Sequence, residues 1–225
     1  NLRVLRSLPV RDLETTAGEI GEALAADTSQ LAAREIESPA PILLVPRVIS
    51  PDDCKRLMAI WEEENQETGV EQSLDGRREE VISHDAKRRR DHLVTGGDQL
   101  RWLTSTVGRR VIPEIRQAFS FKATRFEGFK IVRYDAEEGG VFHAHRDNLS
   151  PSTAHRRFGL TINLNEGYEG GHIRFPEYGP HIYRPPAGAA LLFSCALLHE
   201  VTPVTEGSRF ALLSFMFGEE EARKT

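Results

Sequence analysis

A succession of short apolar or alternating segments in the second half of the chain most constrains what it can fold into. Eight such segments follow one another without an intervening helical pattern, and Gly, Pro and Asn separate them. They cover residues 128–134, 140–147, 158–164, 171–175, 180–184, 189–194, 198–204 and 208–217. Many short strands in close succession pack as sandwiches or barrels. The sequence therefore predicts a mainly β protein, a two-sheet jelly roll or double-stranded β-helix.

Two flanking helices are expected on the N-terminal side of these strands. The segment 50–53, Ser-Pro-Asp-Asp, offers an N-cap, a proline at the first helical position and an acid three residues after the cap. A helix should therefore run from there to about Glu64. A second helix is predicted over 98–119 from its apolar periodicity, with a kink at Pro113. The apolar run 42–45 predicts the first strand of the main sheet.

The chain has 225 residues, which is enough for one sizeable domain with its own core. Residues 1–38 are expected to form an N-terminal appendage, with a short strand at 2–5 and a helix at about 12–26. Residues 39–225 are expected to form the catalytic domain.

Composition narrows the kinds of partner and compartment. The formal net charge of -5 does not indicate a nucleic-acid-binding surface. The chain has only two cysteines, which lie far apart in the sequence, so a reducing compartment is expected. No apolar run approaches the roughly 18 residues of a membrane span, and no signal-peptide pattern is seen. We expect a cytoplasmic protein with no membrane contact, and its oligomeric state stays open.

A polar segment interrupts the apolar pattern at residues 65–97. It is expected to be either a solvated loop or a lid that contacts substrate, because long loops in compact domains are usually functional or disordered. Within it, residues 87–90 form the basic run Lys-Arg-Arg-Arg. If this run faces the active site it favours an acidic or carboxylate-bearing substrate, and otherwise it is solvated surface.

The motif His145-Arg146-Asp147 lies in one of the predicted strands. Side chains two positions apart point the same way in a strand, so His145 and Asp147 can clamp a metal ion. His199, from a distant strand, would complete two imidazoles and one carboxylate, which leaves positions open on non-haem iron. His143 shares the face of His145, so a cupin-like three-histidine site is left open by the spacing. The remaining histidines, 84, 92, 155, 172 and 181, receive no role.

Arg209 stands in the last predicted strand. Ala211, Leu213 and Phe215 share its face at period two and are apolar, so that face should be interior. A guanidinium presents a planar fork that matches a carboxylate and stays charged when desolvated. The position therefore suits the binding of a buried carboxylate.

These residues together carry a resemblance to a known family. With Tyr134, the glycine pair 170–171 and the Pro-Ala-Gly of 186–188, they resemble the iron(II)- and 2-oxoglutarate-dependent dioxygenases, within them the prolyl 4-hydroxylase-like branch. The stretch 199–209 is similar to the bacterial PKHD-type hydroxylases. The resemblance covers about residues 40–217. Many prolyl hydroxylases carry Lys where this chain has Arg209, whereas the PKHD-type pattern has Arg.

The resemblance implies a set of roles. Iron(II), 2-oxoglutarate and dioxygen are the expected cofactor and co-substrates. Arg209 would bind the far carboxylate of 2-oxoglutarate. The iron ligands implied are His145, Asp147 and His199, and the other residues implied near 2-oxoglutarate are Tyr134, through its hydroxyl, and Thr161. Asn163 is a neighbour of Thr161 on the same face, with no role assigned.

The expected reaction couples oxidative decarboxylation of 2-oxoglutarate to hydroxylation of an unactivated C–H bond. The resemblance suggests a prolyl residue of a peptide or protein as substrate, and a small molecule is also open. Two alternatives are a cupin-like metal enzyme that does not use 2-oxoglutarate and a jelly-roll binding module that holds a structural ion or a sugar. Arg209 separates the dioxygenase hypothesis from these two alternatives, because only a 2-oxoglutarate-dependent enzyme needs a buried cation near the metal.

Overall fold

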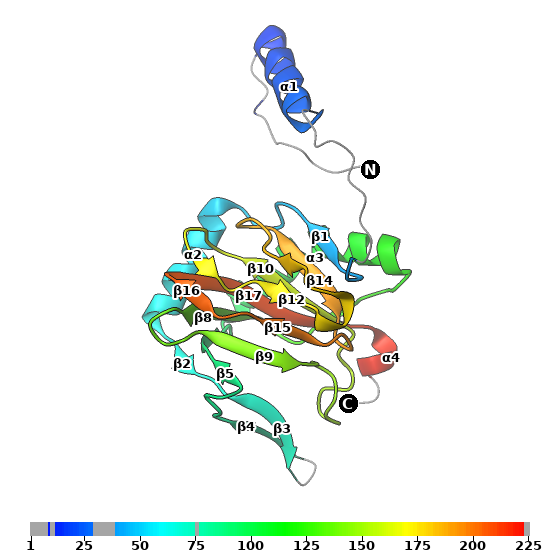
Figure 1. The fold of residues 1–225 in the computed structure, drawn as a ribbon. Helices are drawn as coiled ribbons and strands as arrows, with labels where there is room; N and C mark the ends of the chain where they lie inside the picture. Colours follow the sequence, from blue (N-terminus) through cyan, green and yellow to red (C-terminus); the bar gives the residue numbers. More distant parts are fainter. Residues whose placement is uncertain (1–8, 10–11, 29–38, 75–76, 223–225) are drawn as a thin grey trace. The chain divides into compact units, whose positions relative to one another are not determined.

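A computed structural model describes residues 9, 12–28, 39–74 and 77–222 (Figure 1). The chain divides into two compact units, Asn1–Glu37 and Ser38–Thr225. The first unit contains helix α1 (Leu13–Thr28), where the N–H of Thr15 donates to Asp12 Oδ1 at 2.8 Å and so caps the helix. The strand predicted at residues 2–5 lies outside the described residues.

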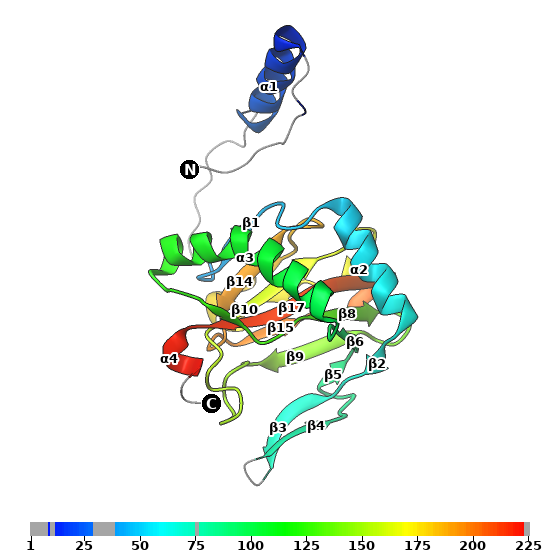
Figure 2. The same cartoon turned by 180° about the vertical axis from the view of Figure 1, so that it is seen from behind.

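Two antiparallel sheets form the framework of the second unit, as predicted (Figures 1 and 2). The larger sheet has the order β1 (Leu43–Val45), β14 (Ala190–Ser194), β10 (Phe158–Asn163), β17 (Ser208–Phe217), β8 (Lys130–Asp135), β6 (Arg90–Leu93) and β2 (Gln66–Glu67), and β7 (Arg125–Phe126) pairs with β17. The smaller sheet has the order β13 (Ile182–Tyr183), β12 (Ile173–Arg174), β15 (His199–Val201), β9 (Val141–His145) and β5 (Lys87–Arg88). This is the double-stranded β-helix with N-terminal helices.

Shorter elements complete the second unit. Two further ladders join β11 (Glu169–Gly170) to β16 (Val204–Glu206) and β3 (Val70–Leu74) to β4 (Arg77–Val81). A 3-10 turn spans Pro176–Tyr178, and helix α4 spans Glu219–Ala222. In the part of the chain that the structure describes, no helix combines the length and apolar character needed to cross a bilayer.

Helices α2 (Pro51–Glu63) and α3 (Gly97–Phe119) match the two predicted helices. Ser50 caps α2 reciprocally, because its Oγ accepts the Asp53 N–H at 3.1 Å and donates to Asp53 Oδ2 at 2.7 Å. Helix α3 continues past Pro113. Both helices lie against the larger sheet, which Figure 2 shows from the side that they cover.

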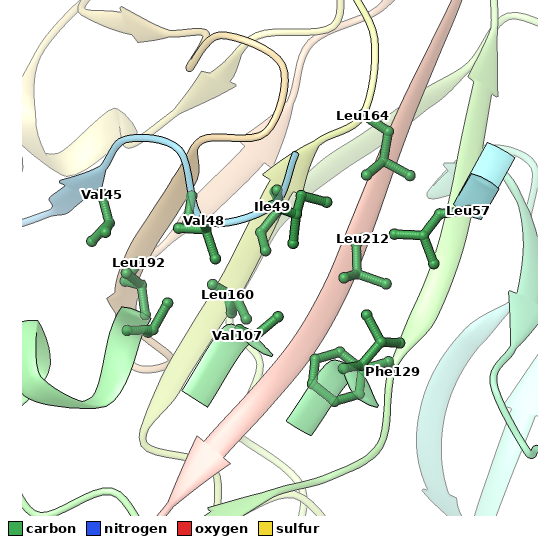
Figure 3. Packing of buried hydrophobic residues seen from close by; sticks show 14 of the residues in the cluster. Val45, Val48, Ile49, Leu57, Val107, Phe129, Leu160, Leu164, Leu192 and Leu212 are labelled. Atoms are coloured by element: carbon green, nitrogen blue, oxygen red, sulfur yellow. The ribbon is translucent and has the colours of Figure 1, made fainter. Parts of the chain in front are cut away.

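The main core fills the space between these helices and the larger sheet (Figure 3). Leu57 of α2 and Val107 of α3 are fully buried, as is Leu212 of β17, and burial of such a side chain stabilises the fold by roughly 1.5–3 kcal/mol. Side chains alternate along β17, so Leu212 faces the helices while Arg209 and Ala211 face the other way. The opposite side of the larger sheet faces the smaller sheet, where apolar side chains such as Val132 and Val201 pack beside buried polar ones.

The structure corrects the solvated-loop interpretation of residues 65–97. This segment contains β2 to β6, and three of these strands extend the main sheets: β6 pairs with β8, β2 pairs with β6, and β5 pairs with β9. The basic run is correspondingly divided, because Lys87 and Arg89 are buried whereas Arg88 is exposed. Two of the four cations of this run therefore point into the interior, because side chains alternate along an extended chain. The interpretation of the run as solvated surface is wrong for these two residues.

Candidate metal centre and co-substrate pocket

Three proposed metal ligands meet where β9 lies beside β15. His145 and His199 are directly opposed across this antiparallel pair, and their rings are 4.3 Å apart between centroids. The Asp147 carboxylate lies between them, with Oδ1 3.4 Å from His145 Nε2 and Oδ2 3.4 Å from His199 Nε2. One ligand atom from each of the three residues lies within 4.8 Å of the other two. The three side chains therefore converge on one point.

Asp147 reaches this point in a different way from the one predicted. Strand β9 ends at His145, and the Asp147 N–H donates to the carbonyl oxygen of Cys195 at 3.0 Å. The carboxylate is thus positioned by the turn after the strand. Gly159 makes room for it, because a Cβ at that position would lie 2.8 Å from Phe193 Cζ and 3.4 Å from Asp147 Oδ2.

Backbone carbonyl groups orient both imidazoles. His145 Nδ1 lies 2.7 Å from the carbonyl oxygen of His143, and His199 Nδ1 lies 3.0 Å from that of Leu197. A carbonyl oxygen only accepts, so each Nδ1 carries the proton and donates it. Each Nε2 is then the nitrogen left for a metal ion, and each lies 3.4 Å from an Asp147 oxygen.

The electrostatics of the site keep the ligands in their metal-binding forms. Burial lowers the pKa of His199, so its imidazole is neutral near neutral pH. Burial alone would raise the pKa of Asp147, but nearby His199 and His145 outweigh it and lower that pKa, so the carboxylate stays ionised.

This donor set fits iron(II). Two neutral nitrogens and one carboxylate oxygen form the arrangement that leaves coordination positions open for other ligands. His143 is exposed and does not belong to the group of metal-binding side chains found among the described residues. The three-histidine site of the cupin alternative is therefore not assembled.

Arg209 is buried on β17, with a side chain only 2% exposed. Its Nη2 donates to Asn163 Oδ1 at 3.0 Å and to Thr161 Oγ1 at 3.4 Å, and its Nε donates to Asn163 Oδ1 at 3.2 Å. These acceptors are neutral, so no carboxylate of the described residues balances the guanidinium. Gly171 allows the close packing, because at its φ of +60° a Cβ would lie 3.0 Å from Arg209 Cδ.

Tyr134 and Thr161, the two other residues that the resemblance implies near 2-oxoglutarate, are buried beside Arg209. The Arg209 guanidinium lies 5.5 Å from the centroid of the Tyr134 ring. Arg89 Nη1 donates to the Tyr134 hydroxyl oxygen at 3.1 Å, which leaves the hydroxyl hydrogen free to donate to a ligand. Asn163, to which the sequence assigned no role, orients Arg209 and donates to Tyr168 and to the carbonyl oxygen of Pro185.

One cavity of about 930 Å³ brings the candidate site together. It is lined by His145, Asp147, His199, Arg209, Tyr134 and Thr161, whereas Asn163 is not part of its lining. Its wall also includes parts of the 65–97 segment, namely Gly69, Val70, Glu71, Glu79, Glu80, Lys87, Arg89 and Leu93. The sequence-based expectation that this segment contacts substrate therefore stays open, whereas its description as a solvated loop is wrong. Arg89 donates to both oxygens of Asp91 at 2.6 Å, and both residues are buried.

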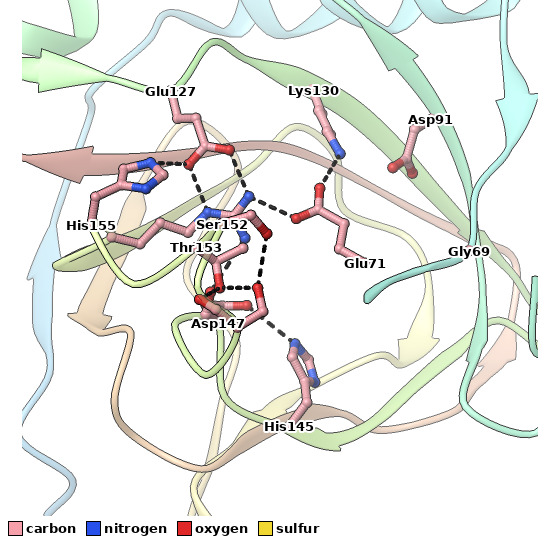
Figure 4. Close-up of polar contacts among 12 residues, drawn as sticks. Gly69, Glu71, Asp91, Glu127, Lys130, His145, Asp147, Ser152, Thr153 and His155 are labelled. Atoms are coloured by element: carbon pink, nitrogen blue, oxygen red, sulfur yellow. Dashed lines mark hydrogen bonds and ion pairs between the residues drawn. The ribbon is translucent and has the colours of Figure 1, made fainter. Parts of the chain in front are cut away.

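Another buried cation, Arg156, supports the turn that carries Asp147. Arg156 Nη1 donates to the Asp147 carbonyl oxygen at 3.3 Å, and Arg156 also binds Glu127 at 2.6 Å and Glu71 at 2.8 Å. Glu71 in turn pairs with Lys130 at 3.5 Å (Figure 4). These pairs connect strand β3 to the metal-site turn and to β8. The pattern of charged and apolar residues in the sequence does not predict these ion pairs.

Comparison with known proteins finds one family to which part of the chain is similar. The sequence profile of the 2OG-Fe(II) oxygenase superfamily matches residues 129–217. A PKHD-type hydroxylase of Paracoccus denitrificans (strain Pd 1222) is 39% identical over 100 residues, which cover 40% of this chain and 42% of that protein. A PKHD-type hydroxylase of Synechococcus sp. (strain JA-2-3B'a(2-13)) is 32% identical over 87 residues, which cover 36% and 39%. The chain thus spans about two fifths of the length of these relatives.

Solved structures share the fold at low sequence identity. A prolyl hydroxylase from Trichoplax adhaerens, in complex with a hypoxia inducible factor oxygen degradation domain peptide fragment, has a TM-score of 0.64 at 14% identity, with 95% of this chain and 96% of that chain covered. A Pseudomonas putida prolyl-4-hydroxylase has a TM-score of 0.58 at 19% identity, with 79% and 92% covered. The profile match and the convergent ligand set show that residues 129–217 are similar to the 2OG-Fe(II) oxygenase superfamily, and the solved structures show that the chain shares their fold.

Proposed function

We propose that this protein is a hydroxylase that acts on a prolyl residue of a peptide or protein. The observation that carries the proposal is that the metal-binding triad and an unbalanced buried guanidinium, Arg209, line the same cavity. When 2-oxoglutarate chelates a metal through its 2-oxo acid end, its far carboxylate needs a cation, and the Arg209 guanidinium can bind it.

The roles of the side chains follow from their chemistry. His145, Asp147 and His199 would hold iron(II), and bound iron supplies the reaction with dioxygen that amino-acid side chains cannot perform. Arg209 binds the far carboxylate of 2-oxoglutarate with a planar fork, and Asn163 Oδ1 fixes the plane of that fork.

Tyr134 and Thr161 assist from the same wall of the cavity. The Tyr134 hydroxyl accepts from Arg89 and can donate its own hydrogen to the carboxylate. Thr161 Oγ1 is within reach of the same guanidinium, at 3.4 Å from Arg209 Nη2. Leu213, Phe142 and other apolar lining side chains restrict water around the co-substrate, which strengthens these charge interactions.

The proposal of a prolyl substrate is based on similarity to relatives and not on a contact in the cavity. The curated relatives are named PKHD-type hydroxylases, and the structural neighbours are named prolyl hydroxylases. A cavity of about 930 Å³ is large enough for a peptide segment beside 2-oxoglutarate.

The test is a coupled assay on the full chain. The protein is loaded anaerobically with Fe(II) and 2-oxoglutarate, exposed to air with a library of proline-containing peptides, and analysed for succinate and for peptides that have gained one oxygen atom. We expect succinate and hydroxyproline in equal amounts for at least one peptide. Succinate without hydroxyproline from any peptide would leave an oxygenase of another substrate class.

A further inference from the structure

Lys87 is a buried cation in the wall of the cavity that the proposed chemistry does not use. Its side chain is 4% exposed. Its Nζ donates to Thr68 Oγ1 at 2.8 Å and to the carbonyl oxygen of Gly69 at 2.6 Å. Both acceptors are neutral, so the ammonium is solvated by dipoles, and no carboxylate of the described residues forms an ion pair with it.

The other cations of the cavity wall are accounted for. Four of them are paired with carboxylates within 4 Å, namely Arg89 with Asp91, Lys130 with Glu71, Arg146 with Glu177, and Arg156 with Glu127. Among the described lysine and arginine residues that line the cavity, Lys87 and Arg209 lack such a partner. Under the proposed function, 2-oxoglutarate brings one carboxylate to the metal and one to Arg209. Lys87 therefore remains without an anion when the co-substrate is bound.

Lys87 and Arg209 belong to opposite sheets. Lys87 lies on β5 opposite Phe142 of β9, and its Nζ is 5.5 Å from the centroid of the Phe142 ring. That ring stacks on His145 at 3.6 Å between centroids, so the ammonium is one aromatic ring away from a proposed iron ligand. A substrate group that binds Lys87 would thus be held close to the reacting bond.

The neighbouring charges make an incoming anion favourable. Burial, and then the Arg89 guanidinium, lower the pKa of Lys87 to about 7; Lys130 acts in the same direction, while Asp91 and Glu80 oppose it. Asp91 is committed to Arg89, and Glu80 makes no ion pair with Lys87. A carboxylate placed beside Lys87 would favour its charged form and gain a poorly screened attraction in return.

We propose that Lys87 binds a carboxylate of the primary substrate, so that the enzyme selects a prolyl residue with an acidic residue close to it in the sequence. The inference rests on the proposed function and names the substrate class more narrowly. A single desolvated charge pair commonly separates a charged substrate from its neutral isostere by tenfold or more.

The experiment uses acetylated pentapeptide amides with a central proline, in which one flanking position at a time carries Asp, Asn or Lys and the others carry Ala. Binding to the full chain loaded anaerobically with Fe(II) and 2-oxoglutarate is measured by calorimetry, and hydroxylation is measured after air is admitted. Lys87→Met removes the charge at similar size, and Lys87→Arg keeps it. Arg88→Met is the matched control, because Arg88 is exposed on the same strand and donates to the carbonyl oxygen of His84.

We expect the wild-type protein and Arg88→Met to prefer Asp over Asn by about tenfold or more at one position, in both binding and kcat/KM. Lys87→Met should reduce that preference to within about twofold, and Lys87→Arg should retain part of it. The thermal unfolding midpoint of each variant shows whether it is folded. The inference is overturned if no position shows an acidic preference in binding, or if Lys87→Met keeps the preference.

Three further outcomes separate this inference from related ones. If Lys87→Met weakens 2-oxoglutarate instead of changing the peptide preference, Lys87 serves the co-substrate carboxylate and the inference fails. If Asp peptides bind through Lys87 but none is hydroxylated, prolyl hydroxylation fails while the anion site stands. If Asp and Asn peptides are hydroxylated equally, prolyl hydroxylation stands and the anion site fails.

Discussion

The substitution Arg209→Leu tests the proposed co-substrate site, because it removes the buried guanidinium that would bind the far carboxylate of 2-oxoglutarate. In the wild-type protein the guanidinium contacts only the neutral oxygens of Asn163 and Thr161, at 3.0–3.4 Å. The far carboxylate of 2-oxoglutarate would be its first anionic partner, and loss of a buried charge-assisted pair costs on the order of 2–5 kcal/mol. At about 1.4 kcal/mol per tenfold change, the Kd of 2-oxoglutarate should rise at least about thirtyfold. Arg209→Lys should recover part of the affinity, because a point charge replaces the fork.

Chemical denaturation with and without 2-oxoglutarate, in the presence of Fe(II) and without oxygen, measures this effect. At a ligand concentration of about 100 times the wild-type Kd, bound 2-oxoglutarate should stabilise the wild-type protein by about 2.7 kcal/mol. A variant with hundredfold weaker binding should gain only about 0.4 kcal/mol under the same conditions. Each protein is compared with itself, so any effect of Arg209→Leu on the unliganded fold cancels. An equal gain in both proteins would refute the assignment of Arg209.

Two other predictions address the metal site and Lys87. Tight Fe(II) binding, measured by metal content after dialysis, should be abolished in each of the variants His145→Ala, Asp147→Ala and His199→Ala. The variant His143→Ala should bind Fe(II) normally, because the His143 side chain is exposed and outside the triad. Loss of iron in His143→Ala alone would reverse this assignment. Lys87→Met should raise the free energy of unfolding most at pH 7 and below. The folded protein there carries a buried ammonium whose pKa is depressed to about 7 from 10.5, and this penalty fades as the pH rises toward 10.5. A difference between the two proteins that does not change between pH 7 and 10 would contradict the burial of a charged Lys87.

The part of the fold with a strong local pattern could be predicted from the sequence. The Ser50 cap places the start of α2, and the period-two apolar residues around Arg209 predict that its side chain faces the interior. The pairing of His145 with His199 could only be hypothesised, because a cross-strand register depends on contacts between distant segments. The same limit explains Asp147, whose position depends on a turn bonded to Cys195.

The solvated-loop alternative for residues 65–97 is wrong, because the strands of this segment carry charged residues where strands usually carry apolar ones. Arg89 and Asp91 neutralise each other inside the protein, so their burial leaves no hydrophobic signature in the sequence. Asn163 was overlooked for a related reason. A buried amide is recognised as functional only when its partner is known, and that partner, Arg209, is 46 positions away.

The two sheets divide the proposed work between them. The larger sheet carries Arg209 with Tyr134 and Thr161, which surround the proposed far carboxylate of 2-oxoglutarate. The smaller sheet carries His145 and His199 on β9 and β15, together with β5, which the 65–97 segment contributes. Changes at Lys87 on β5 can therefore alter which substrate group meets the metal while the far-carboxylate site on the larger sheet is kept. This separation gives a physical reason why one oxygenase framework can retain its co-substrate and exchange its primary substrate.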